Sequence, residues 1–473
     1  TLLCLMNQGA RTYIEAHLQR YPLHYLLHFL RYHLSPDAQS AAQLRDVTGQ
    51  RGENAMNIAD QLTACGLDAM ALDALNVLNS QETLPLYLQA SLQKEGREAL
   101  CLAARKAFPQ HVRFPQWLAE VRMLAAFPDD AFALHLLASF HYSKGNTQTA
   151  VACWQRCLEL EPDFADAWRG LGIDAWNQKQ DAAEARRCLE EACRLQPQDA
   201  RLLFESDLLN RLTGVAPQIR LARLEKVLPV ATQRDDLTAE LLSLYHQCGQ
   251  LQAARALLAD RKFHPWEGGE GRITGQYLLN KQLLAFDYLN SGDVVAAQTL
   301  LLSALEYPQN LSEGRLVGQT DNDICFWLGI CAQKLQQHKQ AQAWFERAAA
   351  GDKGIGERRY YNDQPVDYVF YQGMALRKLN DVVQSRQVFR QMLEWAESAA
   401  DQPVHADFFA VSLPDLVVLT GDRQKEHRIH CLLVKALALR GLEDEAFADV
   451  LQQIFALDPA CGKAHLISQL PDC

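Results

Sequence analysis

This sequence lacks three features that define large classes of proteins: long apolar runs, clusters of basic residues and regularly paired cysteines. No stretch approaches the roughly 20 consecutive apolar residues that a membrane-spanning helix requires, so we expect no membrane partner. No long run of Lys and Arg is present and the formal net charge is −11, whereas nucleic-acid binding depends on a basic surface that neutralises phosphates. We therefore expect no nucleic-acid partner.

Glycine and proline are also scarce, with 25 and 17 among 473 residues, which disfavours a loop-rich all-β fold. Hydrophobic residues make up 48% of the chain and charged residues 22%, the balance of a folded protein rather than a disordered one. Thirteen irregularly spaced cysteines suit a reducing compartment, where Cys acts as a small buried hydrophobe. No basic lead-in or apolar core of a signal peptide follows Thr1. We expect a cytoplasmic protein. Because the sequence starts without Met, a fragment of a longer protein is one interpretation.

A repeating pattern of small and large apolar residues predicts paired helices. The small residues Ala138 and Ala150 stand where two helices of a pair cross, and the large Trp154 fills the seam to the next pair. Pro162 ends the second helix because it lacks the N–H that a further turn needs. The pattern recurs up to Pro197, which lies 35 residues after Pro162. Since one pair cannot bury its apolar face alone, we expect the pairs to stack.

The spellings ADAWRGLGIDAW and CLEEACRLQP resemble the tetratricopeptide repeat family, whose repeat has about 34 residues. Here Gly172 and Ala185 occupy the small crossing positions. Weaker copies follow and more degenerate helical pairs precede, about ten to twelve pairs in all. We predict an all-α, tetratricopeptide-type helical-hairpin solenoid, a right-handed superhelix. Its predicted segments are divergent repeats at 1–129, typical repeats at 130–262, repeats with long connections at 263–425, and a C-terminal capping repeat at 426–473.

The spacing of the repeats widens after Ala254, which indicates that the connections have grown while the helices keep their length. Each long connection follows a second helix, so all of them are expected on one edge of the solenoid. The four decorated loops are 263–275, 307–320, 357–366 and 405–416.

These loops combine aromatic, carboxylate, amide and Arg side chains with Gly and Pro, the ingredients of a pocket for a polar ligand. Packing over the helix ends is the competing interpretation. The candidate ligand-binding residues are Trp266, Glu267, Glu270, Arg272, Asn310, Glu313, Arg315, Tyr360, Tyr361, Asp363, Gln364 and Asp415.

The loop strings FHPWEGGEGRITGQY, YPQNLSEGRLVGQTDNDI, YYNDQPVDYVFYQG and FFAVSLPDL, with YPLHYLLHFLRYHL near the start, resemble a large bacterial family of the YphG type. In that family a β-sandwich domain resembling galactose mutarotase precedes a long tetratricopeptide array. The resemblance covers nearly the whole chain but not that domain, which is absent from these residues. It implies a cytoplasmic role in a sugar-metabolism context, and it carries no catalytic residue over to this chain.

Catalytic and metal-binding patterns are weak by comparison. Two clusters have helical spacing that could place imidazoles on a metal, although incidental histidines on a helix explain both better. These clusters are His24, His28 and His33, and His427, His430 and Cys431.

Other chemistry is equally unsupported. Cys153 and Cys157 fall on seam positions, where packing explains them. The glycines after Gly351 lack the Gly-Lys-Ser/Thr of a phosphate loop, and no serine-hydrolase elbow occurs. Glu267, Glu270 and Asp363 could supply a carboxylate pair for glycoside chemistry, at a separation that the sequence does not give. We predict no catalytic residue, cofactor or metal.

Three functions remain open at this point. The favoured one is a non-enzymatic scaffold that binds a protein segment or its own missing N-terminal β-sandwich domain. The alternative is a carbohydrate-binding module, with a sugar as ligand, that uses the four decorated loops. The least favoured is an enzyme whose active site those loops build. Convergence of Trp266, Glu267, Tyr361 and Asp363 on one cavity would favour the second and third.

Overall fold

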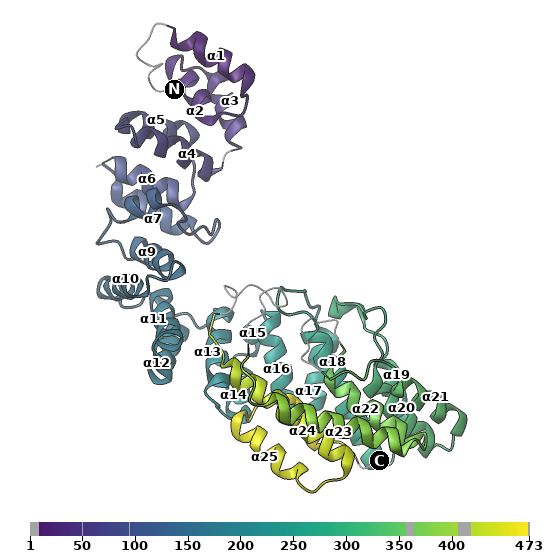
Figure 1. Ribbon diagram of the computed structural model, residues 1–473. Helices are drawn as coiled ribbons and strands as arrows, with labels where there is room; N and C mark the ends of the chain where they lie inside the picture. Colours follow the sequence, from purple (N-terminus) through teal and green to yellow (C-terminus); the bar gives the residue numbers. More distant parts are fainter. Residues whose placement is uncertain (1–8, 50, 94, 356–363, 405–417, 472–473) are drawn as a thin grey trace. The chain divides into compact units, whose positions relative to one another are not determined.

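A computed structural model describes residues 9–49, 51–93, 95–355, 364–404 and 418–471. In these ranges the chain forms α-helices joined by turns and loops, and no β-strand occurs. The predicted all-α architecture of helical pairs is therefore confirmed. The chain divides into two compact units, residues 1–174 and 175–473, and most of their helices are labelled in Figure 1.

The first unit is a stack of short helices that follow one another along the chain. Its helices are α1 (Ala10–Arg20), α2 (Tyr25–Leu34), α3 (Ala38–Thr48), α4 (Gly52–Thr63), α5 (Asp68–Leu78), α6 (Thr83–Leu92), α7 (Arg97–Ala107), α8 (Leu118–Leu124), α9 (Ala131–Ser143) and α10 (Thr147–Leu160). Helix α11 (Ala165–Asn177) carries the division between the units.

In the first unit, the small residues lie at the helix crossings and the large residue fills the seam, as the repeat pattern predicts. Ala138 of α9 and Ala150 of α10 are fully buried where these two helices pack. Trp154 of α10 lies against Gly170 of α11, where an added Cβ would come within 2.3 Å of the indole. Cys157 is buried in the same apolar cluster, with Cys153 packed against it. Burial raises the pKa of the Cys157 thiol to about 12, so this cysteine is a packing residue.

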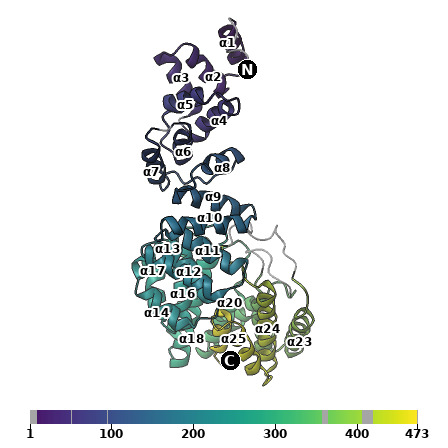
Figure 2. The same cartoon turned by 90° about the vertical axis from the view of Figure 1, so that its left-hand side faces the viewer.

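The second unit continues the pairing with longer elements. Its helices are α12 (Ala182–Leu195), α13 (Ala200–Leu212), α14 (Pro217–Glu225), α15 (Leu228–Ala231), α16 (Asp235–Gln247), α17 (Leu251–Asp260), α18 (Arg272–Ser291), α19 (Val294–Ser303), the 3₁₀ helix η2 (Gln309–Leu311), α20 (Asn322–Lys334), α21 (His338–Ala349), α22 (Val366–Lys378), α23 (Val382–Ala399), α24 (Arg423–Leu442), α25 (Phe447–Leu457) and α26 (Gly462–Ser468). Figure 2 shows the same stack from the side.

One tight turn recurs inside the pairs and fixes how the second helix leaves the first. Its first residue has a positive φ, as at Gly292 (83°) between α18 and α19 and at Asn380 (67°) between α22 and α23. The next residue caps the second helix: the carboxylates of Asp293 and Asp381 accept from the backbone N–H groups of the first turn. Their own N–H groups return to carbonyls of the preceding helix, at 2.9 Å in both cases. The first helix therefore ends at a residue in the left-handed conformation, and the Asp that follows is the N-cap of the second helix.

Glycine on a first helix lets an aromatic ring of a second helix approach the backbone. Phe389 of α23 is fully buried, and its ring lies between Gly373 of α22 and Gly441 of α24. A Cβ at either glycine would stand 2.6 Å or 2.4 Å from a ring atom. Gly329 of α20 and Phe345 of α21 repeat the arrangement at 2.5 Å. The glycines are therefore packing positions of the repeat.

The long connections lie where the sequence predicts them, after a second helix and before the next first helix. The expectation that all the extra length sits in the connections is wrong. Helix α18 has 20 residues and starts at Arg272, inside the predicted loop 263–275. Helices α23 and α24 have 18 and 20 residues, whereas α9 has 13. Repeat spacing alone does not separate a longer helix from a longer loop.

A buried ionic group ties together the start of the second unit. Arg220 of α14 is 1% exposed and makes two hydrogen bonds to Asp207 of α13, at 3.1 and 2.6 Å. It also donates to Glu240 of α16 at 3.1 Å, and Glu240 pairs with Arg211 as well. These charge-assisted bonds satisfy groups that are excluded from water.

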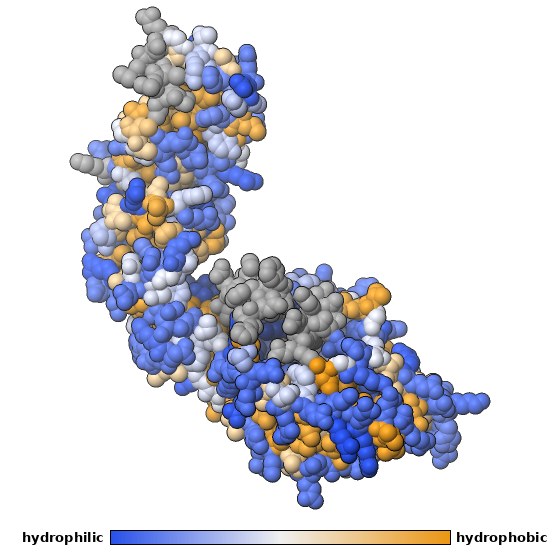
Figure 3. Space-filling view, viewed as in Figure 1, coloured by the Kyte–Doolittle hydropathy of each residue, from blue (hydrophilic) through white to orange (hydrophobic). Residues whose placement is uncertain are grey.

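The visible face in Figure 3 carries apolar side chains scattered among hydrophilic ones on both units. Within the described ranges, no helix combines the length and apolar composition that crossing a membrane requires.

Candidate binding groove

Four first helices of the second unit are joined by contacts to one C-terminal segment, residues 460–471. Gln247, at the end of α16, donates to the Ala460 carbonyl at 2.9 Å. Lys463 pairs with Asp367 of α22 at 2.9 Å. Arg440 of α24 donates to the Leu470 carbonyl at 3.4 Å. Leu470 and Pro471 line one cleft together with Phe326 and Trp327 of α20. We call the surface of α16, α20, α22 and α24 that faces this segment the inner groove.

Burial distinguishes the helices of the groove from those behind them. Helix α20 is buried without interruption from Asn322 to Ala332, whereas α21 buries Ala341, Phe345 and Ala348. Because every face of α20 is buried over this stretch, other elements must pack against it both toward the groove and away from it.

On the groove side the cover comes from the C-terminal segment. Its buried residues recur every third position: Cys461, Ala464, Ile467 and Leu470. All four belong to the same apolar core cluster as α20, α22 and α24.

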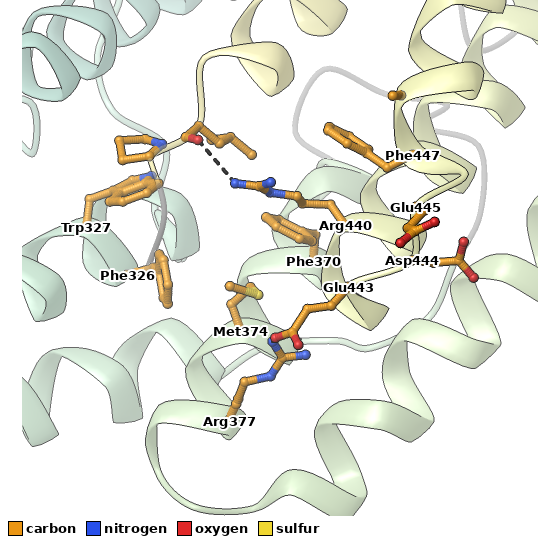
Figure 4. Close-up of a pocket in the computed structure, with 13 residues that line it drawn as sticks. Phe326, Trp327, Phe370, Met374, Arg377, Arg440, Glu443, Asp444, Glu445 and Phe447 are labelled. Atoms are coloured by element: carbon orange, nitrogen blue, oxygen red, sulfur yellow. Dashed lines mark hydrogen bonds and ion pairs between the residues drawn. The ribbon is translucent and has the colours of Figure 1, made fainter. Parts of the chain in front are cut away.

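Beside this segment the groove widens into a cleft of about 460 Å³. Aromatic and thioether side chains form much of its wall, and charged residues from the end of α24 form its rim (Figure 4). The lining residues are Phe326, Trp327, Phe370, Met374, Arg377, Arg440, Glu443, Asp444, Glu445, Phe447, Ala448, Leu470 and Pro471.

Two arginines on the cleft are held by neighbours in the chain. The Arg377 guanidinium contacts the Glu443 carboxylate at 2.7 Å and donates to the Gly441 carbonyl. Arg440 lies 5.6 Å from the centroid of the Phe447 ring. In Figure 4 the Arg440 side chain lies beside Phe370 in the middle of the cleft. The cleft thus places fixed cationic groups next to an apolar wall.

Trp327 is the most tightly fixed aromatic of the wall. It is 1% exposed and packs edge-on against Phe286 and Phe326, with ring centroids 4.7 and 5.3 Å apart. Its Nε1 donor is buried and has no acceptor among the residues that the structure describes. A buried donor without an acceptor is unfavourable, so an acceptor atom placed next to this N–H would stabilise the structure.

Two of the decorated loops meet, and the predicted residues take part in joining them. The side-chain amide of Asn310 donates to the backbone carbonyls of Leu258 and Arg261 at 2.7 and 2.8 Å. The backbone carbonyl of Asn310 accepts from the Phe263 N–H at 2.8 Å. The Glu313 carboxylate accepts from the N–H of Gly271 at 2.9 Å. These contacts connect loop 263–275 to loop 307–320.

Sequence reasoning missed a polar cluster below the second of these loops. Arg315 pairs with Asp321, whose carboxylate also accepts from Gln319 at 2.6 Å. Nearby, Asp323 is buried and accepts from Gln282 at 2.7 Å. Burial raises the pKa of Asp323 to about 7. These aspartates stand at the start of α20 and look like ordinary helix-start residues, so only their burial identifies them.

Five further candidate residues lie within the described ranges. Trp266 is half-buried against the apolar cluster of α16 and α18, and its indole covers Gly269. Glu267, Glu270 and Arg272 are exposed. Gln364 donates to the Asp352 carbonyl at 2.6 Å.

Four candidates, Tyr360, Tyr361, Asp363 and Asp415, lie outside the described residues, as do all of loop 405–416 and most of loop 357–366. The residues that line the cleft include none of the eight candidates that the structure describes. Their role in ligand binding stays a prediction.

The two candidate metal clusters have other partners. His24 caps α2, and His28 contacts the Pro22 carbonyl at 2.7 Å. His33 pairs with Asp73 at 3.1 Å, and His427 contacts the Ala399 carbonyl at 2.8 Å. In the part of the chain that the structure describes, no three His, Cys, Asp or Glu side chains gather as metal ligands do.

Solved structures similar to this chain include YrrB, a TPR protein with an unusual peptide-binding site, at 14% identity and a TM-score of 0.27, covering 48% of this chain and 89% of that one. Naa15/Naa10 bound to HypK-THB matches at 14% identity and a TM-score of 0.34, over 77% of this chain and 64% of that one. The human IFIT1 dimer with PPP-AAAA matches at 13% identity and a TM-score of 0.27, over 92% and 94%. Scores this low carry no conclusion about function.

The sequence itself matches a family model at one place, residues 133–164. These residues span α9 and α10, the pair whose crossing alanines and seam tryptophan follow the repeat pattern most closely. The family is described as "Tetratricopeptide repeat", and residues 133–164 are a repeat of this type.

Proposed function

We propose that this chain is a non-enzymatic tetratricopeptide-type scaffold whose inner groove binds a segment of a partner protein. The observation that carries the proposal is the cleft of about 460 Å³ beside a groove in which a helical segment already lies. Aromatic residues, Met and Arg are enriched in protein interfaces, and the wall of the cleft carries Trp327, Phe370, Met374 and Arg377. Stacked helical pairs commonly present such extended surfaces to other proteins.

The resemblance of the loop strings to the YphG-type family supports a more specific partner. In that family the array follows a β-sandwich domain, so a segment of such a domain is the first partner to test and a segment of a second protein is the other. A cytoplasmic location and a sugar-metabolism context rest on the same resemblance.

A peptide library displayed on phage and selected on the immobilised full chain tests the proposal. Selected peptides are then measured by fluorescence anisotropy against the unchanged chain and against Met374→Glu. Met374 is half-buried on the cleft wall, so a carboxylate there disfavours an apolar ligand. We expect the Kd to rise at least about tenfold, which corresponds to about 1.4 kcal/mol.

Val383→Glu is the matched control, because Val383 is 81% exposed on α23 and lines no part of the cleft. It should leave the Kd unchanged. Selected peptides that bind Met374→Glu and the unchanged chain equally well would place their site elsewhere and contradict the proposal.

A carbohydrate-binding module is the second candidate, and one observation favours it: loops 263–275 and 307–320 meet, as the contacts of Asn310 and Glu313 show. Exposed Glu267, Glu270 and Arg272 lie on the first of these loops and at its helical end.

Thermal unfolding in the presence of mono- and oligosaccharides, with the unchanged chain and with Trp266→Ala, tests this second candidate. A sugar at about a hundred times its Kd should stabilise the unchanged chain by about 2.7 kcal/mol. The variant should show a smaller shift. Equal melting temperatures with and without every sugar would dismiss the carbohydrate function.

A further inference from the structure

We propose that residues 460–471 are an internal ligand of the inner groove, and that the partner is a short amphipathic helix, ending in an apolar residue and proline, which displaces them. This inference rests on the function proposed above and specifies the chemistry of the partner. It follows from how the segment is held, from what it leaves unfilled and from the charges around it.

The segment has the form of a helical peptide laid into a groove. Helix α26 has seven residues, fewer than an isolated helix needs to be stable in water, so its conformation depends on the groove. Cys461, Ala464, Ile467 and Leu470 form one buried stripe, whereas Ser468, next to Ile467 in the chain, is exposed. Apolar anchors at helical spacing are the usual way in which a helix binds in a groove.

Polar contacts and apolar packing both hold the segment in place. Among the described residues, Gln247 donates to the Ala460 carbonyl, Lys463 pairs with Asp367, and Arg440 donates to the Leu470 carbonyl at 3.4 Å. Lys463 is exposed, and an exposed ion pair contributes little. The buried side chains of Cys461, Ala464, Ile467 and Leu470 supply apolar packing that another amphipathic helix can reproduce.

The internal segment also fills the groove incompletely. The cleft of about 460 Å³ remains between Trp327, Phe370, Met374 and the end of the segment at Leu470 and Pro471. Two of the four anchors are small, Cys461 and Ala464. A partner with larger apolar anchors would fill more of this space.

The unpaired donor of Trp327 points to the same conclusion. Its Nε1 has no acceptor within the described ranges, although Leu470 and Pro471 lie on the same cleft. A partner that brings a carbonyl or hydroxyl oxygen to this position gains a hydrogen bond that the internal segment does not make.

The carboxylates around the groove can receive basic residues of a partner. Asp367 already accepts Lys463 of the internal segment, and Asp444 and Glu445 are exposed on the rim. The cations of the cleft have contacts in the chain, since Arg377 pairs with Glu443 and Arg440 donates to the Leu470 carbonyl. A basic residue of a partner helix at the place of Lys463, about two turns before its apolar end, would meet Asp367.

A labelled synthetic peptide with the sequence of residues 459–471 tests the inference in the presence of a reductant. Its binding to the full chain is measured by fluorescence anisotropy for the unchanged chain, for Ile467→Asp and for Ser468→Asp. Ile467 is 6% exposed in the groove, so a charge there releases the internal segment and opens the site. We expect Ile467→Asp to bind the peptide at least about tenfold more tightly than the unchanged chain.

Ser468→Asp introduces the same charge at the exposed neighbouring position and should bind like the unchanged chain. A peptide that itself carries Ile467→Asp should not bind Ile467→Asp chain. Equal affinity of the unchanged and Ile467→Asp chains for the original peptide would overturn the inference, provided that circular dichroism shows both to be folded.

Hydrogen exchange on the unchanged chain provides a measurement that needs no variant. If the segment opens while the groove stays folded, the amides of α26 exchange at least about tenfold faster than those of α20 and α22. Equal protection of α26 and α22 would show that the segment leaves only on global unfolding and would overturn the inference. Library peptides that lose affinity for Met374→Glu without exposing α26 would leave the proposed function standing while this inference falls.

Discussion

Replacing Gly373 by Ala tests whether the glycine positions of the repeat are set by ring packing. Gly373 lies inside α22, where Ala is normally the better residue by about 1 kcal/mol because it restricts the unfolded chain. Here, however, the new Cβ would stand 2.6 and 2.7 Å from two carbon atoms of the Phe389 ring. Packing and helix propensity therefore predict opposite signs for the same substitution.

The ring has little room to move away. Phe389 is fully buried, and its other contact is Gly441, where a Cβ position lies 2.4 Å from the ring. Forcing an additional methyl into such a core costs about 1–3 kcal/mol. After subtraction of the gain in helix propensity, we expect Gly373→Ala to destabilise the second unit by up to about 2 kcal/mol.

Urea unfolding followed by circular dichroism measures the free energy, and hydrogen exchange of α22, α23 and α24 localises the effect. Gly275→Ala is the matched control, because Gly275 is helical, exposed and has no atom within 4 Å of its Cβ position. It should stabilise the protein by about 0.5–1 kcal/mol. Phe389→Leu removes the ring, so Gly373→Ala should cost less in that background than in the unchanged chain.

Two outcomes would refute the reasoning. A stability gain for Gly373→Ala equal to that of Gly275→Ala would mean that the ring does not constrain the helix. An equal cost of Gly373→Ala in the presence and absence of the Phe389 ring would mean that the cost has another origin, since contacting residues should show coupling.

Two further predictions concern buried charges of the second unit. Arg220→Met leaves the carboxylate of Asp207 buried without its cation and removes one of the two arginines that pair with Glu240. It should cost about 3–5 kcal/mol in urea unfolding, and a loss below about 1 kcal/mol would contradict the assigned burial. Because burial raises the pKa of Asp323 to about 7, the folded state holds this proton more tightly than the unfolded state. This contribution to stability should therefore fall as pH rises from about 4 through 7. Melting temperatures of Asp323→Asn should depend less on pH over that window, and an unchanged slope would contradict the assignment.

Much of the repeat could be predicted because its rules are local. The small residues Ala138 and Ala150, and Trp154 at the seam, carry the period in the sequence and are buried as predicted. The sequence also predicted that the long connections follow the second helix of a pair. It did not predict the length of these connections, because the start of α18 at Arg272 depends on packing that repeat spacing does not reveal.

The candidate site was less predictable, because its residues look like core. Trp327 and Phe370 belong to the apolar pattern of α20 and α22, and Met374 follows one turn later. Nothing local separates a wall of a cleft from the interior of a helix stack. The loop residues, in contrast, are conspicuous in the sequence, yet Asn310 and Glu313 make their contacts within the chain.

The sequence by itself determined that the chain is a series of helical pairs, because small, large and helix-ending residues recur with the helical period and act on their nearest neighbours. Only the tertiary structure decided that residues 460–471 lie against α16, α20, α22 and α24. The physical reason is distance along the chain. Contacts between Gln247 and Ala460 are set by how far each stacked pair rotates against the next, and these small rotations add up over the whole second unit.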